Sequence, residues 1–270
     1  MFRTVAKVGL IALVLSLGLA APVAAGPFED GVAAYGRGDY AAALRLIRPL
    51  ADQGKPSAQA MLGLMYALGQ GVTQDYAAAL TWYRKAADQG LATAQADLGS
   101  MYDQGLGVKQ DYAAALAWFR KAADQGFAGA EYNLGLIYAN GKGVPKDSMA
   151  AVIWFRKAAD QGDAAAQFKL GVMYENGEGV PQGFAAAVTW YREAADRGDA
   201  DAQYHLGAMY VSGKSVPQDY VTAYMWLELA AAAGNLDASQ DVDVVARRMS
   251  PAQIAEAQKL AHEWKPKSNY

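Results

Sequence analysis

The chain contains no cysteine and only two histidines, His205 and His262. Without cysteine it can form neither disulfide bonds nor a thiolate zinc site, and it lacks the residue through which bacterial lipoproteins are anchored. The histidines lie in different repeats, and His262-Glu263 lacks the second histidine of a metalloprotease motif. We therefore expect no metal ion and no other cofactor.

Clustered positive charge is also missing. The net charge is −3, and it is −5 after residue 25, because the first 25 residues hold Arg3 and Lys7 and no acid. An acidic body without a basic block is unsuited to neutralising phosphates, so nucleic acid is excluded as the expected partner. The acidic residues form no distinctive pair, and the glycine-rich segments recur as connectors that follow no strand. These absences argue against an enzyme.

Only the N-terminus carries a long apolar run. Arg3 and Lys7 precede the apolar stretch from Val8 to Leu19, and the small residues Val23-Ala24-Ala25 follow it. The stretch is shorter than the roughly 20 residues that a membrane-spanning helix needs. This pattern predicts a signal peptide over residues 1–25 that is removed after Ala25, although an uncleaved membrane anchor is the alternative. We expect an exported protein, periplasmic or secreted, with no stable membrane insertion after cleavage.

What the chain does contain is a repeat of 36 residues. Segments of the type ADQG end in glycines at a constant spacing, namely Gly54, Gly90, Gly126, Gly162, Gly198 and Gly234. A fixed period of this length is typical of a solenoid, in which each unit buries its apolar face against its neighbours. Solenoids mostly bind other molecules, so the period favours a binding function.

Residues 55–90 show the plan of one repeat. The sequence predicts a first helix from Pro56 to Leu68 and a second from Asp75 to Gln89. Gly69 and Gly90 suit the left-handed residue that ends a helix, and Asp75 suits an N-cap. The cap recurs at Asp111, Asp147 and Asp219, and Gly183 interrupts it.

Three features recur in every repeat and are predicted to form the core. A Leu-Gly pair, a tyrosine and a tryptophan keep fixed positions, as in Leu62-Gly63, Tyr66 and Trp82. A glycine inside a helix costs about 1 kcal/mol relative to alanine. Its recurrence therefore predicts that another helix passes too close to leave room for a side chain.

This pattern, A-x-x-x-LG-x-M-Y-x-x-G-x-G-V-x-x-D-Y-x-x-A-x-x-W-Y/F-R-K-A-A-x-x-G, resembles the Sel-1-like repeat family, which is related to the tetratricopeptide repeats. The resemblance implies an all-α fold, a right-handed α-solenoid of antiparallel helix pairs, and a role as a scaffold or adaptor. Bacterial members are often exported, and some modulate sensor kinases or envelope assembly. A cysteine-rich branch is linked to β-lactams, but this chain lacks cysteine and departs from that branch.

The resemblance and the period together divide the chain into four parts. After the signal peptide (1–25), residues 26–54 resemble a tetratricopeptide-like capping hairpin, and residues 235–270 form C-terminal capping helices and a frayed tail. Ser250 to Gln253 is a predicted capping box. Between the two ends lie five repeats, 55–90, 91–126, 127–162, 163–198 and 199–234.

Candidate binding residues are those that differ between repeats. Four positions on the first helix of each repeat share one stripe, which in helical-hairpin solenoids lines the concave surface. Three successive repeats add an aromatic residue beside the variable polar one. The predicted partner-binding residues are Tyr132, Asn133, Asn140, Phe168, Lys169, Asn176, Tyr204, His205 and Ser212. The stripe is interpreted either as a peptide groove or as aromatics wedged between repeats with solvated polar neighbours.

Two functional hypotheses follow. The favoured one is a non-catalytic adaptor in the bacterial envelope that binds a protein partner on its concave face, for example a regulator such as the ectodomain of a sensor kinase. The alternative is an envelope enzyme or glycan-binding protein that acts on cell-wall material or β-lactams.

Overall fold

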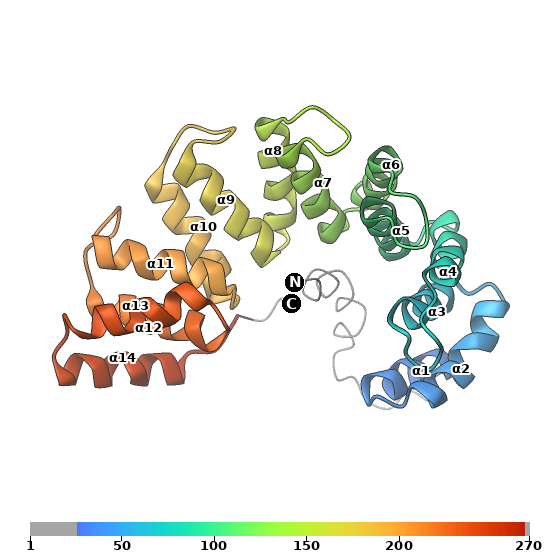
Figure 1. The fold of residues 1–270 in the computed structure, drawn as a ribbon, viewed down its shortest axis with the longest axis horizontal. Helices are drawn as coiled ribbons and strands as arrows, with labels where there is room; N and C mark the ends of the chain where they lie inside the picture. The colour runs from blue at the N-terminus through green and yellow to red at the C-terminus, as the bar shows by residue number, and fades with distance from the viewer. Residues whose placement is uncertain (1–25, 268–270) are drawn as a thin grey trace. The chain divides into compact units, whose positions relative to one another are not determined.

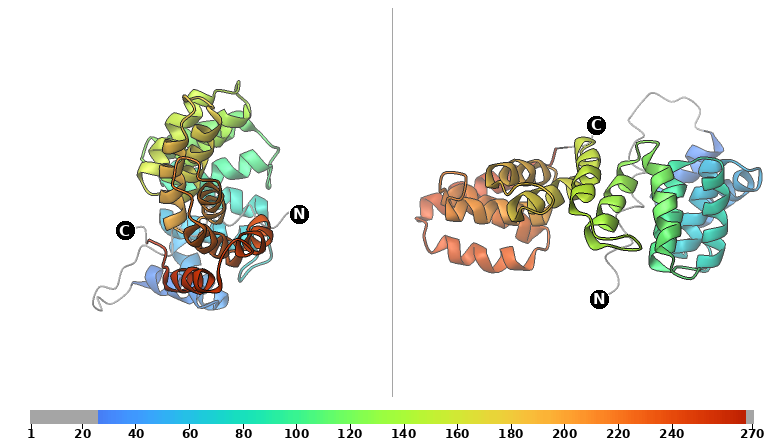
Figure 2. Two further views of the ribbon diagram at one scale, coloured as in Figure 1. Left: turned by 90° about the vertical axis from the view of Figure 1, so that its left-hand side faces the viewer. Right: turned by 90° about the horizontal axis from the view of Figure 1, so that it is seen from above.

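The computed structural model describes residues 26–267, which form fourteen helices and no strand (Figures 1 and 2). The prediction of an all-α fold of helix pairs is thereby confirmed. The predicted signal peptide and residues 268–270 lie outside the described residues. No helix in residues 26–267 combines the length and the apolar character needed to cross a membrane.

Two series of helices alternate along the repeats. The first helices are α3 (Pro56–Leu68), α5 (Ala92–Gln104), α7 (Ala128–Asn140), α9 (Ala164–Asn176) and α11 (Ala200–Ser212). The second helices are α4 (Tyr76–Asp88), α6 (Tyr112–Ala123), α8 (Ser148–Asp160), α10 (Phe184–Asp196) and α12 (Tyr220–Ala232). The hairpin of α1 (Pro27–Gly36) and α2 (Tyr40–Asp52) precedes them, and α13 (Leu236–Ala246) and α14 (Pro251–Glu263) follow.

The helices belong to two compact units. Among the described residues, unit 1 contains 26–133 and 142–144, and unit 2 contains 134–141 and 145–267. In unit 1, α3 packs against α4 and α5 against α6, and in unit 2, α9 packs against α10 and α11 against α12. Each pair also packs on the next pair of its own unit. Within each unit, the surface formed by its first helices is called the first-helix surface of that unit below.

Capping fixes the helix ends as the sequence predicts. α3 begins and ends at the predicted residues, and α4 is one residue shorter at each end. The Asp75 carboxylate accepts hydrogen bonds from the amides of Ala77 and Ala78 at 2.9 and 3.0 Å. Gly69 ends α3 with a φ of 68°, and Gly183 begins α10 without a side-chain cap. The caps at Asp111, Asp147 and Asp219 and the capping box at Ser250 are likewise present.

A second left-handed residue turns the loop inside each repeat, two positions after the helix-ending glycine. In Gly179 φ is 70°, and a Cβ there would lie 2.3 Å from the carbonyl oxygen of Ser148. The last repeat has Ser215 at this position with a φ of 60°, the one non-glycine residue with positive φ among the described residues. Ser215 thus holds a conformation that disfavours a side chain by about 1–2 kcal/mol.

Replacing Ser215 with glycine is expected to raise the free energy of unfolding by about 0.5–1 kcal/mol. The left-handed strain is relieved, and the greater freedom of glycine in the unfolded chain offsets part of that gain. Urea titration followed by circular dichroism measures the difference. Ser212→Gly, which places the same residue inside α11, is the control and should lower stability. A Ser215→Gly variant no more stable than the natural chain would contradict the expectation.

The recurring glycine of the first helix lies against an aromatic ring. In unit 2, a Cβ on Gly171 would lie 2.5 Å from the Cδ1 and Cε1 atoms of Tyr191, which comes from the second helix. The prediction that another helix comes too close to leave room for a side chain is therefore confirmed: the second helix fills this place with a side chain and, at Gly207, also brings the Ala223 carbonyl oxygen to 3.2 Å from the Cβ position. The buried residues in this role are Tyr83, Phe119, Phe155, Tyr191 and, in the last repeat, Leu227.

The recurring tyrosine and tryptophan lie at the edge of the core. Leu62 and its counterparts are fully buried, but the tyrosines and all the tryptophans of the repeats except Trp226 are half-buried. Arg48 donates to the Tyr66 hydroxyl at 2.7 Å, and Lys85 lies 4.1 Å from the Trp82 ring centroid. The same arginine–tyrosine bonds join Arg84 to Tyr102, Arg156 to Tyr174 and Arg192 to Tyr210. These contacts account for the basic pairs at the ends of the second helices.

A row of buried glutamines joins consecutive repeats, and the sequence analysis did not identify it. Gln59 donates to the carbonyl of Ala51 at 3.3 Å and accepts a bond from Gln89 at 2.8 Å. Each such glutamine therefore ties its first helix to the helix that precedes it and to the end of the second helix in its own repeat. Gln95 repeats both bonds with Ala87 and Gln125.

In unit 2 the row is incomplete. Gln167 and Gln203 keep the bond to the preceding helix, but their Oε1 atoms are buried without a hydrogen-bond partner. The donor is missing because Arg197 and Ala233 stand where the earlier repeats have glutamine, and Arg197 directs Nη1 to Glu193. A buried polar atom without a partner costs about 1–3 kcal/mol.

Arg197→Gln is expected to raise the free energy of unfolding by about 1 kcal/mol. The new amide can donate to Gln167 Oε1 as Gln89 does to Gln59. The contacts of Arg197 Nη1 to the Glu193 carboxylate and carbonyl are lost, and a surface ion pair of this kind is worth less than about 1 kcal/mol. Thermal and urea unfolding measure the gain. Arg197→Ala removes the same ion pair without supplying a donor, so equal stability of the two variants would contradict the expectation.

The C-terminal end of the chain closes unit 2. The Trp264 ring packs edge-on against Trp226, with centroids 6.2 Å apart, and α14 packs against α12. Lys267 donates from its amide to the Asp196 carbonyl, and its ammonium lies 2.7 Å from the Asp196 carboxylate. The prediction of a frayed tail was therefore wrong for Lys265 to Lys267, because these contacts hold that segment on α10.

Candidate functional site

The predicted binding residues are divided between the two units. Tyr132 and Asn133 belong to unit 1, where both are half-buried on α7 and Asn133 donates to the Gly129 carbonyl at 2.7 Å. The others belong to unit 2, where α7 contributes Asn140, α9 contributes Phe168, Lys169 and Asn176, and α11 contributes Tyr204, His205 and Ser212.

Unit 2 brings two of these residues, Phe168 and Tyr204, together around a third, His205. The imidazole stacks on Tyr191, with centroids 5.0 Å apart and the rings inclined by 26°. Phe168 lies 5.5 Å and Tyr204 5.7 Å from the same imidazole, centroid to centroid. Three aromatic rings from α9, α10 and α11 therefore surround one histidine.

A carboxylate at the end of α9 joins this aromatic group to a cation. Glu175 accepts a hydrogen bond from the Tyr191 hydroxyl at 2.7 Å, and its Oε2 lies 3.6 Å from Nδ1 of His205. Lys214 approaches the other oxygen at 3.9 Å and lies 3.6 Å from the Phe184 ring centroid. Phe168, Glu175, Tyr191, Tyr204, His205 and Lys214 together are called the His205 cluster.

The cluster offers both donors and acceptors of hydrogen bonds. Burial, the hydrogen bond to Glu175 and the charge of that carboxylate all raise the pKa of Tyr191, so its hydroxyl stays protonated and acts as a donor. No group of three or more metal-binding side chains is present among residues 26–267. The arrangement suits recognition of polar groups beside apolar ones.

The aromatics predicted from the sequence also pack between helices. Phe168 and Tyr204 are half-buried, and each touches a hydrophobic core group of unit 2. Burial raises the pKa of Tyr204, and the nearby carboxylates of Asp241 and Asp237 raise it further. This packing agrees with the wedge interpretation, and the groove interpretation stays a prediction.

The other predicted residues of unit 2, Asn140, Lys169, Asn176 and Ser212, lie outside the cluster. Asn176 donates to Glu178 at 3.2 Å, and the Ser212 hydroxyl donates to the Ala208 carbonyl at 3.0 Å. Both residues are exposed at the ends of their helices, as is Asn140. These three residues therefore lie at helix ends. The cluster instead contains Tyr191, Glu175 and Lys214, which the sequence analysis did not select.

The same stripe carries a half-buried acid in unit 1. Asp97 on α5 holds the position that His205 holds on α11. The charge of Asp97 helps to raise the pKa of Tyr83, which is the buried ring from the second helix of the preceding repeat. Burial raises the pKa of the Asp97 carboxyl from 3.8 to about 7. No hydrogen bond or ion pair of Asp97 occurs among the described residues. The ionised form of Asp97 therefore lowers the stability of the folded chain.

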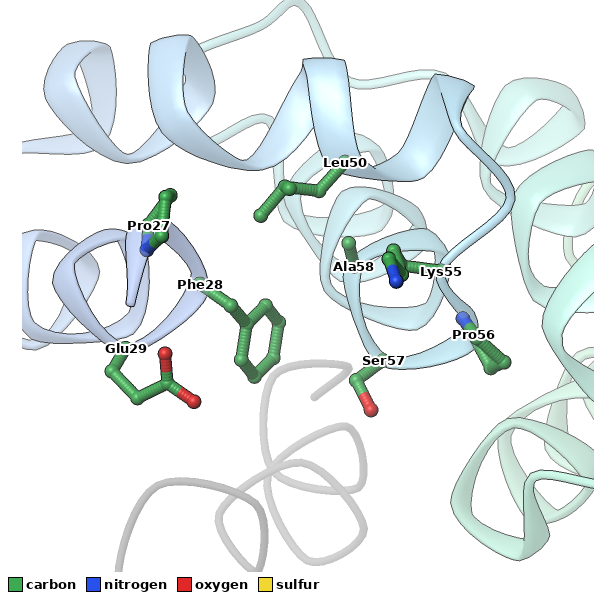
Figure 3. Close-up of a pocket in the computed structure, with 8 residues that line it drawn as sticks. All are labelled: Pro27, Phe28, Glu29, Leu50, Lys55, Pro56, Ser57 and Ala58. Atoms are coloured by element: carbon green, nitrogen blue, oxygen red, sulfur yellow. The ribbon is translucent and has the colours of Figure 1, made fainter. Parts of the chain in front are cut away.

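Unit 1 also has an apolar recess at its N-terminal end. The recess has a volume of about 270 Å³ and lies between α1, the end of α2 and the start of α3. Figure 3 shows the Phe28 ring and the Leu50 side chain directed into it, with Glu29 and Ser57 at the edge. Nothing in the structure shows what covers this recess.

Comparison with known proteins places the helix pairs in a defined class. The Sel1 repeat model matches residues 56–91, 92–127, 128–163, 164–199 and 200–235. A Sel1 repeat protein from Oxalobacter formigenes is 37% identical, with a TM-score of 0.78 over 88% of this chain and 96% of that one. The protective antigen c5321 from uropathogenic Escherichia coli is 38% identical, with a TM-score of 0.76 over 88% of this chain. This chain covers 53% of the length of c5321.

More distant similarity concerns the fold alone. The immunity protein Pa5087 from Pseudomonas aeruginosa is 22% identical with a TM-score of 0.53 over 75% of this chain and 81% of that one. No match was found among curated proteins.

The packing of paired helices thus defines a helical repeat protein of the solenoid class. More specifically, the chain belongs to the Sel1 repeat family, because the family model covers residues 56–235 and relatives of known structure are 37–38% identical. Sel1 repeat proteins generally mediate protein–protein interactions, and the fold is typically a non-catalytic scaffold.

Proposed function

We propose that this protein is a non-catalytic adaptor of the bacterial envelope that holds a segment of a partner protein on the first-helix surface of unit 2. The observation that carries the proposal is the His205 cluster, where aromatic rings and charged groups from three helices converge around a partly exposed imidazole. The general role of Sel1 repeat proteins in binding other proteins supports it.

The chemistry of the cluster suits a peptide segment. The side chains of His205, Glu175 and Lys214 are 37%, 25% and 45% exposed, so they remain accessible although they contact one another. Aromatic edges provide contact area at low cost in side-chain entropy, and the charged groups can bond to backbone or polar side chains. Lys169, half-buried over Phe168, adds a donor on α9.

Export is part of the proposal. The N-terminal pattern in residues 1–25 supports a signal peptide, and a periplasmic location would give the adaptor access to envelope regulators, including sensor-kinase ectodomains. The absence of cysteine is compatible with an oxidising compartment, because the helices of both units hold together by packing.

Capture of partners from envelope extract tests the proposal with two matched double variants. Lys169→Ala with His205→Ala removes accessible groups of the first-helix surface and leaves Phe168, Tyr191 and Tyr204 unchanged. Met149→Ala with Ile153→Ala removes two exposed side chains from the second helix α8. We expect the first pair to reduce partner retention at least tenfold and the second pair to leave it unchanged.

The opposite pattern would move the binding surface to the second helices and contradict the proposed site. Retention of cell-wall fragments, or their turnover, without any protein partner would favour an enzyme or a glycan-binding protein instead. Replacing Tyr132, Phe168 and Tyr204 with alanine is a poorer test, because Phe168 and Tyr204 pack against the core and their loss should lower the melting temperature.

A further inference from the structure

The interval between α11 and α13 in unit 2 contains an open apolar recess. The recess has a volume of about 140 Å³, and Ala208, Val211, Leu227, Val244 and Val245 provide its apolar lining. Val244 is 48% exposed, so the recess opens to solvent on its side. Asp241 adds a carboxylate to the lining. This cavity is called the Leu227 recess.

The recess exists because a ring is missing. In the preceding interval, Tyr191 passes under Gly171 and its ring continues outward until it stacks on His205. In the last repeat, Leu227 takes the same place under Gly207, with its Cγ 2.9 Å from the position of a Cβ there. The side chain of Leu227 is shorter and ends where the outer half of a tyrosine ring would begin. The space in front of Asp241, which lies 36 residues after His205, is therefore not filled.

The charge around the recess is negative and uncompensated. Asp237 and Asp241 both raise the pKa of Tyr204, which places the two carboxylates close to its hydroxyl. Asp201 lies at the start of α11 and accepts a hydrogen bond from Asn235, which precedes α13. Among residues 26–267, no ion pair joins Asp201, Asp237 or Asp241 to a cation. The apolar hole is thus lined by one acid, Asp241, with Asp237 one helical turn before it on α13.

We infer that the Leu227 recess receives an apolar side chain of the partner that lies next to a positive charge. Cavities of about 150 Å³ lined by aliphatic side chains accept groups as large as benzene, so an isobutyl or phenyl group fits the available volume. The adjacent cation would pair with Asp241. This inference rests on the proposed binding of a partner segment along the first-helix surface, because the recess continues that surface beyond His205.

L-leucinamide is a suitable probe, because it carries an isobutyl group beside an ammonium and has no carboxylate. We expect its addition at pH 6.5 to shift the amide resonances of Val211, Asp241 and Val244 in the nitrogen-15-labelled chain, with a dissociation constant in the millimolar range. N-acetyl-leucinamide, which lacks the charge, should bind several-fold more weakly. Glycinamide, which lacks the apolar group, should cause no localised shifts.

Three variants locate the binding. Leu227→Phe should fill the recess as a ring does in the earlier repeats and should reduce leucinamide binding at least tenfold without lowering the melting temperature. Ala208→Leu fills the recess from an exposed position on α11. It therefore tests the inference even if Leu227→Phe disturbs folding. Asp241→Asn should weaken binding of leucinamide to the level of its acetylated form.

Leucinamide shifts that are absent, or that persist unchanged in a folded Ala208→Leu or Leu227→Phe chain, would overturn the inference. The proposed adaptor function would be judged separately, because the variant with Lys169→Ala and His205→Ala should still bind leucinamide while losing the partner. A partner retained fully by the Leu227→Phe chain would also overturn the inference and leave the adaptor intact.

Discussion

Gly171→Ala is expected to lower the free energy of unfolding by about 2 kcal/mol. In an open helix the same change would gain about 1 kcal/mol from helix propensity. Here the new methyl group would stand 2.5 Å from the Tyr191 ring, which is fully buried and cannot move aside without disturbing its own contacts. Overpacking of this kind costs about 1–3 kcal/mol. Urea titration followed by circular dichroism and tryptophan fluorescence measures the loss.

Two other glycines of the chain provide matched controls. Gly36→Ala, at the end of α1, meets no atom within 4 Å and should be neutral or stabilising. Gly63→Ala would meet the Tyr83 ring at 3.0–3.2 Å and should cost less than Gly171→Ala. The expected order of stability is therefore Gly36→Ala, Gly63→Ala and Gly171→Ala. An equal effect at the last two positions would show that ring distance does not decide the cost.

A double-mutant cycle tests whether the loss comes from the ring. Tyr191→Leu introduces the residue that the last repeat carries at Leu227, and it removes the outer ring and the hydroxyl bond to Glu175. On that background, Gly171→Ala should cost at least 1 kcal/mol less than in the natural chain. Additive losses would mean that the methyl group meets an obstacle other than Tyr191.

The fold followed from the sequence because its rules are local and repeated. The aspartate caps and the left-handed glycines act within one or two helical turns, and the period of 36 residues repeats them along the chain. The structure has them where they were predicted. The degree to which each side chain is buried could not be derived in the same way. A fixed register shows that Trp82 and Tyr66 recur, but only the packing shows that Tyr83 is the fully buried ring and Trp82 lies at the edge.

The candidate site was only partly predictable for a related reason. The variable stripe indicated Phe168, Tyr204 and His205, which the structure brings together, and their role in binding stays a prediction. Tyr191 was missed because its position holds tyrosine in two repeats, phenylalanine in two and leucine in the last, and the sequence analysis gave it no role. Its hydroxyl is the signal that could have identified it, since a buried phenol usually has a hydrogen-bond partner, and here that partner is Glu175.

Asp97→Asn is expected to stabilise the protein in a way that depends on pH. The folded-state pKa of Asp97 is raised by burial to about 7 from the ordinary 3.8, so folding favours the protonated acid. The stability that Asp97 contributes is complete below pH 3.8 and is lost as the pH rises through 7. At pH 8 the natural chain carries a desolvated charge. A rise from 3.8 to about 7 corresponds to at most about 4 kcal/mol, and solvent contact of this partly exposed residue reduces the expected gain to about 2 kcal/mol.

Asparagine is a suitable replacement because the next repeat has Asn133 at the corresponding position, so the amide fits the repeat without a change of shape. The difference in unfolding free energy between the variant and the natural chain should be near zero at pH 4 and complete at pH 8. Taking that difference at each pH cancels the titration of other acids, including Asp199, whose pKa is raised to about 6 by burial. A gain that is the same at both pH values would show that Asp97 is uncharged or well solvated throughout, and the buried carboxylate of unit 1 would then store no electrostatic cost.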